Sequence, residues 1–202
     1  CNTGCNITSG DYNVHLGYRA GGGSTSTAQT GTFNITMGTD TAQCLTTGAA
    51  NILMGTATAK ANCITGARNV SLGCRAAVVL SSGNDNVTIG THAGCGISDG
   101  DNNVMIGMCA GFCNNAQHNV FLGTCAGKTV TGSKNIILGD GMRSGSNSGS
   151  CNIFLGQEQA TQGNTTGNFN IVAGYYAAYA LTSGCCNVLI GNYAGKYVST
   201  GK

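Results

Sequence analysis

Residues 100–107 of the chain read Gly-Asp-Asn-Asn-Val-Met-Ile-Gly, and by themselves they look like part of a glycine-rich binding loop. The same frame recurs along the whole chain: an Asn, an Ile or Val, a variable residue, an apolar residue and a Gly. Eleven copies occur, and their asparagines lie 16 to 21 residues apart. These asparagines are Asn13, Asn34, Asn51, Asn69, Asn86, Asn103, Asn119, Asn135, Asn152, Asn170 and Asn187.

Other positions repeat with the same period. A Gly stands three residues before the Asn in ten of the eleven copies, with Ala116 as the exception. A pair of small residues follows the apolar run, as in Ala93-Gly94 and Ala110-Gly111. One short β-type run per period indicates a solenoid, in which a single coil cannot bury its apolar face alone. We expect an all-β fold, a parallel β-solenoid (β-roll) of about eleven coils of ~17 residues each, and a single repeat domain over residues 1–202.

The repeated asparagines have a structural explanation. Each one would occupy the same corner of its coil, where Asn tolerates a bent backbone. Stacked amides can bond to the Asn of the coil above and below, as in the ladders of stacked sheets. We therefore interpret the Asn series as a structural ladder and not as a ligand site.

Bulk composition narrows the possible functions. With 34 Gly, no Pro, no Trp and 16 charged residues among 202, the chain has little material for a conventional globular core. It has no apolar run long enough for a transmembrane helix and no basic amphipathic helix, so we expect no membrane insertion. A net charge of +2 with scattered Lys and Arg gives no electrostatic footprint for nucleic acid. No pattern indicates a cofactor.

Twelve cysteines are many for a chain that lacks zinc-binding spacing. Three pairs fall at matching or nearly matching positions of adjacent coils, where a spacing of about 4.8 Å suits a disulfide. We predict disulfides between Cys44 and Cys63, between Cys109 and Cys125, and between Cys95 and Cys113. The alternative is a column of small buried thiols. Disulfides would place the chain in an oxidising compartment: extracellular, on a cell surface or on a virion.

The strand residues suggest self-association. We expect the first and third residues after each Asn to line the core and the second residue to face outward. The second position is apolar in the last six copies, where it is Met105, Phe121, Ile137, Phe154, Val172 and Leu189. A stripe of this kind on a soluble rod predicts an interface, and cyclic symmetry closes it most simply. We expect a homo-oligomer, a trimer, with tighter contact in the second half.

The repeat unit, as in NVTIGTHAG at 86–94 and NVMIGMCAG at 103–111, resembles the repeats of trimeric autotransporter adhesin heads and of phage or virus tail fibres. The resemblance covers nearly the whole chain. It implies a parallel β-roll whose three chains pack around one axis, and a role in attachment to a cell-surface receptor or glycan. The coil register begins and ends in mid-coil, so we expect a window from a longer fibre protein. Binding residues are expected on the variable arcs Gly21–Gly31 and Gly141–Gly149, where coil length and polarity change most.

We expect no enzymatic activity. His15, His92 and His118 stand at different coil positions, so none is placed beside a nucleophile as catalysis requires. Three alternatives remain open. A hexapeptide-repeat acyltransferase would need three hexads per coil, of which one fits. An ice-binding solenoid would need an outward Thr column, which is not seen. The third is a subunit of a filament that polymerises end to end.

Overall fold

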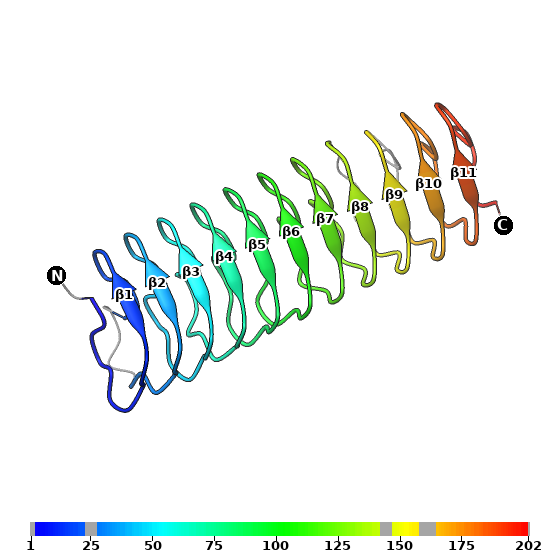
Figure 1. The fold of residues 1–202 in the computed structure, drawn as a ribbon. Coiled ribbons are helices and arrows are strands. Elements are labelled where there is room, and N and C mark those ends of the chain that lie inside the picture. The colour runs from blue at the N-terminus through cyan, green and yellow to red at the C-terminus, as the bar shows by residue number, and fades with distance from the viewer. Residues whose placement is uncertain (1–2, 23–27, 142–146, 158–164, 202) are drawn as a thin grey trace.

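The computed structural model describes residues 3–22, 28–141, 147–157 and 165–201. Its regular structure is one sheet of eleven parallel strands whose spatial order follows the chain order. Figure 1 shows the strands side by side along an elongated solenoid, with the two ends of the chain at its opposite ends. The strands are β1 (Val14–Leu16), β2 (Ile35–Met37), β3 (Ile52–Met54), β4 (Val70–Leu72), β5 (Val87–Ile89), β6 (Val104–Ile106), β7 (Val120–Leu122), β8 (Ile136–Leu138), β9 (Ile153–Leu155), β10 (Ile171–Ala173) and β11 (Val188–Ile190).

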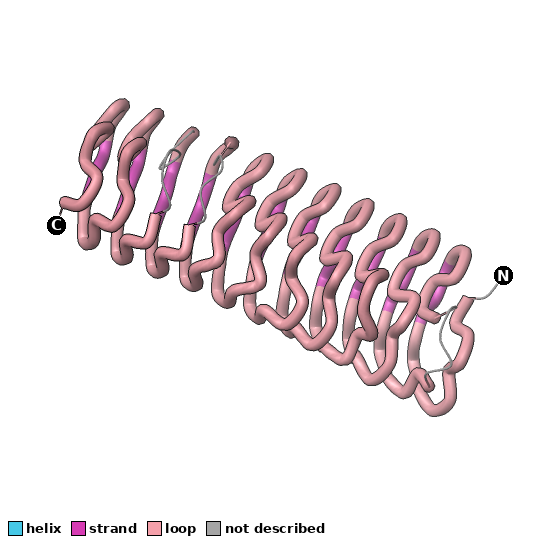
Figure 2. The backbone as a smooth tube through the Cα atoms, turned by 180° about the vertical axis from the view of Figure 1, so that it is seen from behind, coloured by secondary structure: helices cyan, strands magenta, loops and turns pink. Residues whose placement is uncertain are grey.

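Every strand comes from one copy of the repeat and pairs in register with the next copy, so that Val87 lies beside Val104 and Thr88 beside Met105. The prediction of an all-β parallel β-solenoid is confirmed. Seen from behind in Figure 2, the rest of each coil is loop and turn that stacks on its neighbours. The described residues contain no helix that is long and apolar enough to cross a membrane.

The predicted orientation of the strands is wrong. The second residue after each Asn points into the coil: Met105, Phe121, Ile137, Phe154 and Val172 are at most 1 % exposed. Leu189, in the last strand, is partly buried against the same core. These six residues therefore form part of the core, and the first and third residues of each strand face outward. The second residues of β2 to β5 are buried too, including the polar Thr36, Ser71 and Thr88, while His15 in β1 is half-buried.

Two further columns complete the core. A small residue seven positions after the Asn, such as Ala93, Ala110 or Ala126, is fully buried. An aliphatic residue about four positions further on, such as Leu80 or Ile97, is also fully buried. Both columns face the second strand residue. The interior of each coil is therefore filled by three side chains: the second strand residue, the small residue and the aliphatic residue. The polar members find partners, since the Thr88 hydroxyl donates to the Ser71 hydroxyl at 2.9 Å.

The coil turns sharply because several residues adopt left-handed backbone conformations. The residue before each Asn has a positive φ, for example 57° at Asp85 and 58° at Asn102. The Gly that ends each strand has a φ near the mirror image of the β region, which is 132° at Gly107. A Cβ at Gly107 would also lie 2.4 Å from the carbonyl oxygen of Gly123 in the next coil. Only Gly satisfies both conditions, which explains why this position is Gly in all eleven copies.

Candidate functional site

The Asn ladder is present as predicted. The Asn51 Oδ1 accepts hydrogen bonds from the backbone N–H of Asn69 at 2.9 Å and from its Nδ2 at 3.0 Å. The backbone N–H bond to the preceding Asn occurs at all ten steps between Asn13 and Asn187. Nine of the ladder asparagines, Asn34 to Asn170, are at most 1 % exposed. The ladder is therefore a structural element, and its buried side chains are closed off from solvent in these nine coils.

Sequence reasoning missed one part of this ladder. The Asn34 Nδ2 also donates to the carbonyl oxygen of Gly48 at 2.8 Å, and Gly48 stands three residues before the next Asn. The same bond joins Asn86 to Gly100 at 2.8 Å and Asn170 to Gly184 at 2.9 Å. The Gly and the Asn recur with the same period, and this shared period was the signal in the sequence that could have predicted the bond. At Gly100 a Cβ would lie 2.5 Å from the Ala116 carbonyl oxygen of the next coil, which explains the Gly at this position.

Of the three predicted disulfides, one is formed. Cys44 and Cys63 are bonded, with their Cα atoms 4.4 Å apart. Cys95, Cys109, Cys113 and Cys125 are free thiols, so the other two pairs are not disulfides in this structure.

The two unformed pairs differ in geometry. Cys95 and Cys113 are one position out of register, and the backbone of Cys113 lies against Gly96 instead of Cys95. Cys109 and Cys125 share one register position on adjacent coils. Burial raises the pKa of the Cys125 thiol, and the neighbouring Cys109 thiol raises it further. The second pair therefore remains as neighbouring thiols, the alternative state considered for these cysteines.

The outward side of the strands forms one continuous apolar surface, which we call the sheet face. Its residues are Val14, Leu16, Ile35, Met37, Ile52, Met54, Val70, Leu72, Val87, Ile89, Val104, Ile106, Val120, Leu122, Ile136, Leu138, Ile153, Leu155, Ile171, Ala173, Val188 and Ile190. None is polar or charged. Even within the stack, Ile106 and Leu122 are each 36 % exposed and Ile171 is 40 % exposed. The sheet face is therefore an apolar surface that the described strands leave partly open.

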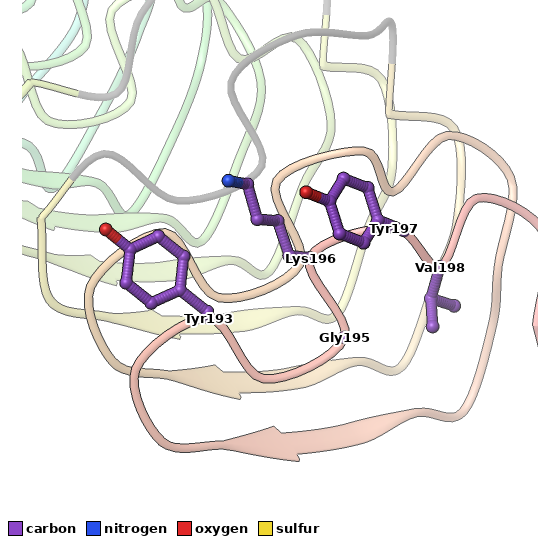
Figure 3. A pocket seen from close by; sticks show the side chains of 5 residues that line it. All are labelled: Tyr193, Gly195, Lys196, Tyr197 and Val198. Carbon is purple, nitrogen blue, oxygen red and sulfur yellow. The ribbon is translucent and has the colours of Figure 1, made fainter.

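A second surface, which we call the turn edge, consists of the solvent-facing side chains among the residues five to ten positions after each Asn, on the turn that follows the strand. It carries the aromatic and cationic side chains of several coils. Near the C-terminal end, Tyr176 stacks on Tyr193 with ring centroids 5.9 Å apart, and Tyr175 meets both rings edge-on. In Figure 3, Lys196 lies between Tyr193 and Tyr197, and its Nζ is 4.9 Å and 5.4 Å from the two ring centroids.

The histidines occupy three unrelated environments. His15 is half-buried in the first coil, where its Nδ1 lies 2.7 Å from the Thr36 hydroxyl and its Nε2 lies 3.2 Å from the Gln29 Nε2. Burial lowers the pKa of His15. His92 lies on the turn edge beside Phe112, and His118 is exposed before Asn119. Among the described residues, no group of three or more His, Cys, Asp or Glu side chains is arranged to hold a metal ion.

The arcs Gly21–Gly31 and Gly141–Gly149 were expected to carry binding residues. Their central parts, residues 23–27 and 142–146, lie outside the described residues. Comparisons of the chain with protein-family models, with curated protein sequences and with solved structures found no match.

Proposed function

We propose that the chain is a structural segment of an extracellular or virion-borne fibre, which assembles with copies of itself and serves in surface attachment. The observation that carries this proposal is the sheet face. Its outward positions are Val, Ile, Leu or Met on every strand, with Ala173 as the one smaller residue. Soluble proteins rarely leave a contiguous apolar surface of this extent unless a partner covers it.

A second copy of the chain is the partner that fits this face best. Ten steps between eleven strands at about 4.8 Å make a face roughly 50 Å long and one strand wide. A copy of the same chain has the same straight shape and the same spacing of apolar rows. Parallel copies around an axis along the rod would cover the face over its full length. The resemblance of the repeats to trimeric fibre proteins favours three copies.

Multi-angle light scattering tests the assembly. A chain of 20.2 kDa is expected to elute with three times that mass and to keep it on dilution. The double variant Ile106→Glu with Leu122→Glu places two charges on the sheet face and is expected to elute as a monomer. Its far-ultraviolet circular dichroism should stay unchanged, because both side chains point away from the core.

Thr124→Glu is the matched control, because Thr124 is exposed on the turn edge of the same region. It should assemble like the parent chain. A parent chain that remains a 20.2 kDa monomer over the whole concentration range would refute self-assembly.

A further inference from the structure

The turn edge of the coils that carry β3 to β7 concentrates positive charge. It is formed by residues 56–61, 74–79, 91–96, 108–113 and 124–129, which contain three Lys or Arg residues and no Asp or Glu. We call these five segments the central turn edge. Lys60, Arg75, His92, Phe112 and Lys128 come from five consecutive coils. They occupy two register positions, six and nine residues after the Asn, and at about 4.8 Å per coil this row of side chains extends roughly 19 Å along the rod.

Four side chains of this row line a hollow. Lys60, Arg75, Val78, His92, Cys95 and Phe112 line a depression of about 470 Å³. Phe112 forms an aromatic wall, with its ring centroid 6.0 Å from that of His92 and 5.8 Å from the Lys128 Nζ. The hollow therefore combines an aromatic ring with the cations Lys60 and Arg75, and the Lys128 Nζ lies near the same ring.

The three cations differ in whether they are paired with an acidic side chain. Lys60 is held by Asp40 of the preceding coil, with Nζ 3.0 Å from Oδ2. Arg75 is exposed and forms no ion pair with any described residue. Lys128 is also exposed. Its Nζ lies near the Phe112 ring, and it forms no ion pair with any described residue. Arg75 is thus the guanidinium that is open to an anionic ligand.

We propose that the central turn edge binds a linear acidic polysaccharide that lies along the rod axis. A guanidinium can bind a carboxylate or sulfate through two parallel hydrogen bonds, which suits Arg75. The flat C–H face of a sugar ring can pack on Phe112, as apolar groups pack on exposed aromatic rings. Lys128, three coils from Arg75, can then meet an anionic group further along the same polysaccharide chain. The proposal rests on the proposed attachment function and names the class of ligand.

A nucleic acid is the rival polyanion, and the row fits it less well. Binding of single strands relies on several aromatic platforms for successive bases, whereas this row contains one phenyl ring. The net charge of +2 over the chain is also small for a nucleic-acid surface.

The sheet face contributes nothing to this site, because the site lies on the turn that follows each strand.

Binding of the full chain to immobilised probes tests the proposal. The probes are heparin, which carries sulfates and carboxylates, hyaluronan, which carries carboxylates only, neutral dextran, and a single-stranded oligothymidylate. We expect binding to heparin, to hyaluronan or to both, and none to dextran. Arg75→Ala and Phe112→Ala should each weaken the affinity about tenfold. Both variants should fold, since Ala57 stands at the register position of Arg75 and Val78 at that of Phe112.

Lys134→Ala is the control, because Lys134 is an exposed cation outside the hollow and Ala50 stands at its register position. It should change the affinity less than about twofold. Equal weakening by Lys134→Ala and Arg75→Ala would overturn the site. So would the absence of binding to both acidic polysaccharides, or tighter binding of the oligothymidylate.

Light scattering on the same variants separates this proposal from the assembly. A protein that assembles but binds no acidic polysaccharide refutes the site alone. A monomer that binds heparin through Arg75 supports the site and refutes the assembly.

Discussion

At the scale of single residues, the asparagines contribute most to the specificity of the fold. The buried Asn amides satisfy backbone groups of neighbouring coils: the Asn86 Nδ2 donates to the Gly100 carbonyl oxygen, and the Asn86 Oδ1 accepts from the Asn103 backbone N–H. Buried amides without such partners would strongly destabilise the coil. The Asn119 Nδ2 is the one ladder amide that is buried without a hydrogen-bond partner among the described residues.

Removal of one ladder amide should therefore be costly. In Asn86→Ala the Asn103 backbone N–H loses its acceptor, which lies at 3.0 Å, and the Gly100 carbonyl loses its side-chain donor. We expect the free energy of unfolding to fall by about 2–4 kcal/mol. Urea titration followed by circular dichroism measures it. Gln117→Ala, at an exposed position, should change it by less than about 0.5 kcal/mol, and a similar loss in both variants would contradict the assigned role.

His15 should make the first coil sensitive to acid. Burial lowers the pKa of His15 in the folded chain, so the unfolded chain takes up its proton first. Its contribution is complete above the ordinary histidine pKa of about 6.5 and is lost as the pH falls from there toward the folded value. Unfolding at pH 7.5 and 5.0 should show a larger loss for the parent chain than for His15→Thr. Thr36 shows that Thr fits this position. Equal losses would refute the prediction.

At the scale of one coil, the second strand residue and the residue six positions later share a small space. A Cβ at Gly127 would lie 2.7 Å from the Phe121 ring, and one at Gly111 would lie 2.3 Å from the Met105 sulfur. Ala77 and Ala178 occupy the same position in coils whose inner residues are the smaller Ser71 and Val172. The two positions are therefore complementary in size within these coils.

A double-mutant cycle tests this complementarity. Gly127→Ala should destabilise the chain by about 2–3 kcal/mol, because the added methyl group overpacks the coil. In combination with Phe121→Val, which copies the pair Val172 and Ala178, the cost of Gly127→Ala should shrink by at least about 1 kcal/mol. Urea titrations of the four proteins give the coupling energy. Strict additivity would show that the two positions do not share space.

The Cys109–Cys125 pair should be oxidisable between coils. Oxidised glutathione is expected to convert the two thiols to one disulfide, with release of two molecules of reduced glutathione. Their shared register position on adjacent coils favours this reaction, while Cys95 and Cys113 are out of register. Peptide mapping after alkylation identifies the product. Formation of a Cys95–Cys113 bond in place of Cys109–Cys125 would contradict the register argument.

At the scale of the whole molecule, contacts between strands occur only between neighbours along the chain. Stability in such a solenoid is close to a sum of coil and coil–coil terms. A central coil is covered on both sides, whereas the last described coil is covered on one. Met105 is fully buried, while Leu189 in β11 is partly buried.

Equivalent truncations should therefore differ with position. We expect Met105→Ala to lower the free energy of unfolding by about 2–4 kcal/mol and Leu189→Ala by about half as much. The measurement is urea unfolding of the variants at one fixed concentration, because self-assembly would add to stability. Equal losses at the two positions would contradict the nearest-neighbour description.

The sequence by itself determined the period, the parallel β-solenoid and the Asn ladder, because stacking identical coils leaves one way to satisfy a repeated buried amide. The sequence also predicted the Cys44–Cys63 bond, although their counts to the next Asn differ by one; the bridge between Leu45 and Ile64 brings the two cysteines into register. The sequence did not show which side of each strand faces the core, because residues on both sides are mainly apolar and alternation alone does not distinguish the two sides.

The tertiary structure decided that orientation. Left-handed residues such as Asp85 and Gly107 turn the chain so that the second strand residue meets the small Ala column and the aliphatic column. The same turn brings Arg75, His92 and Phe112, from three different coils, around one hollow. These side chains lie close together because of the direction in which each one leaves its turn, and the spacing of residues along the chain does not predict that direction.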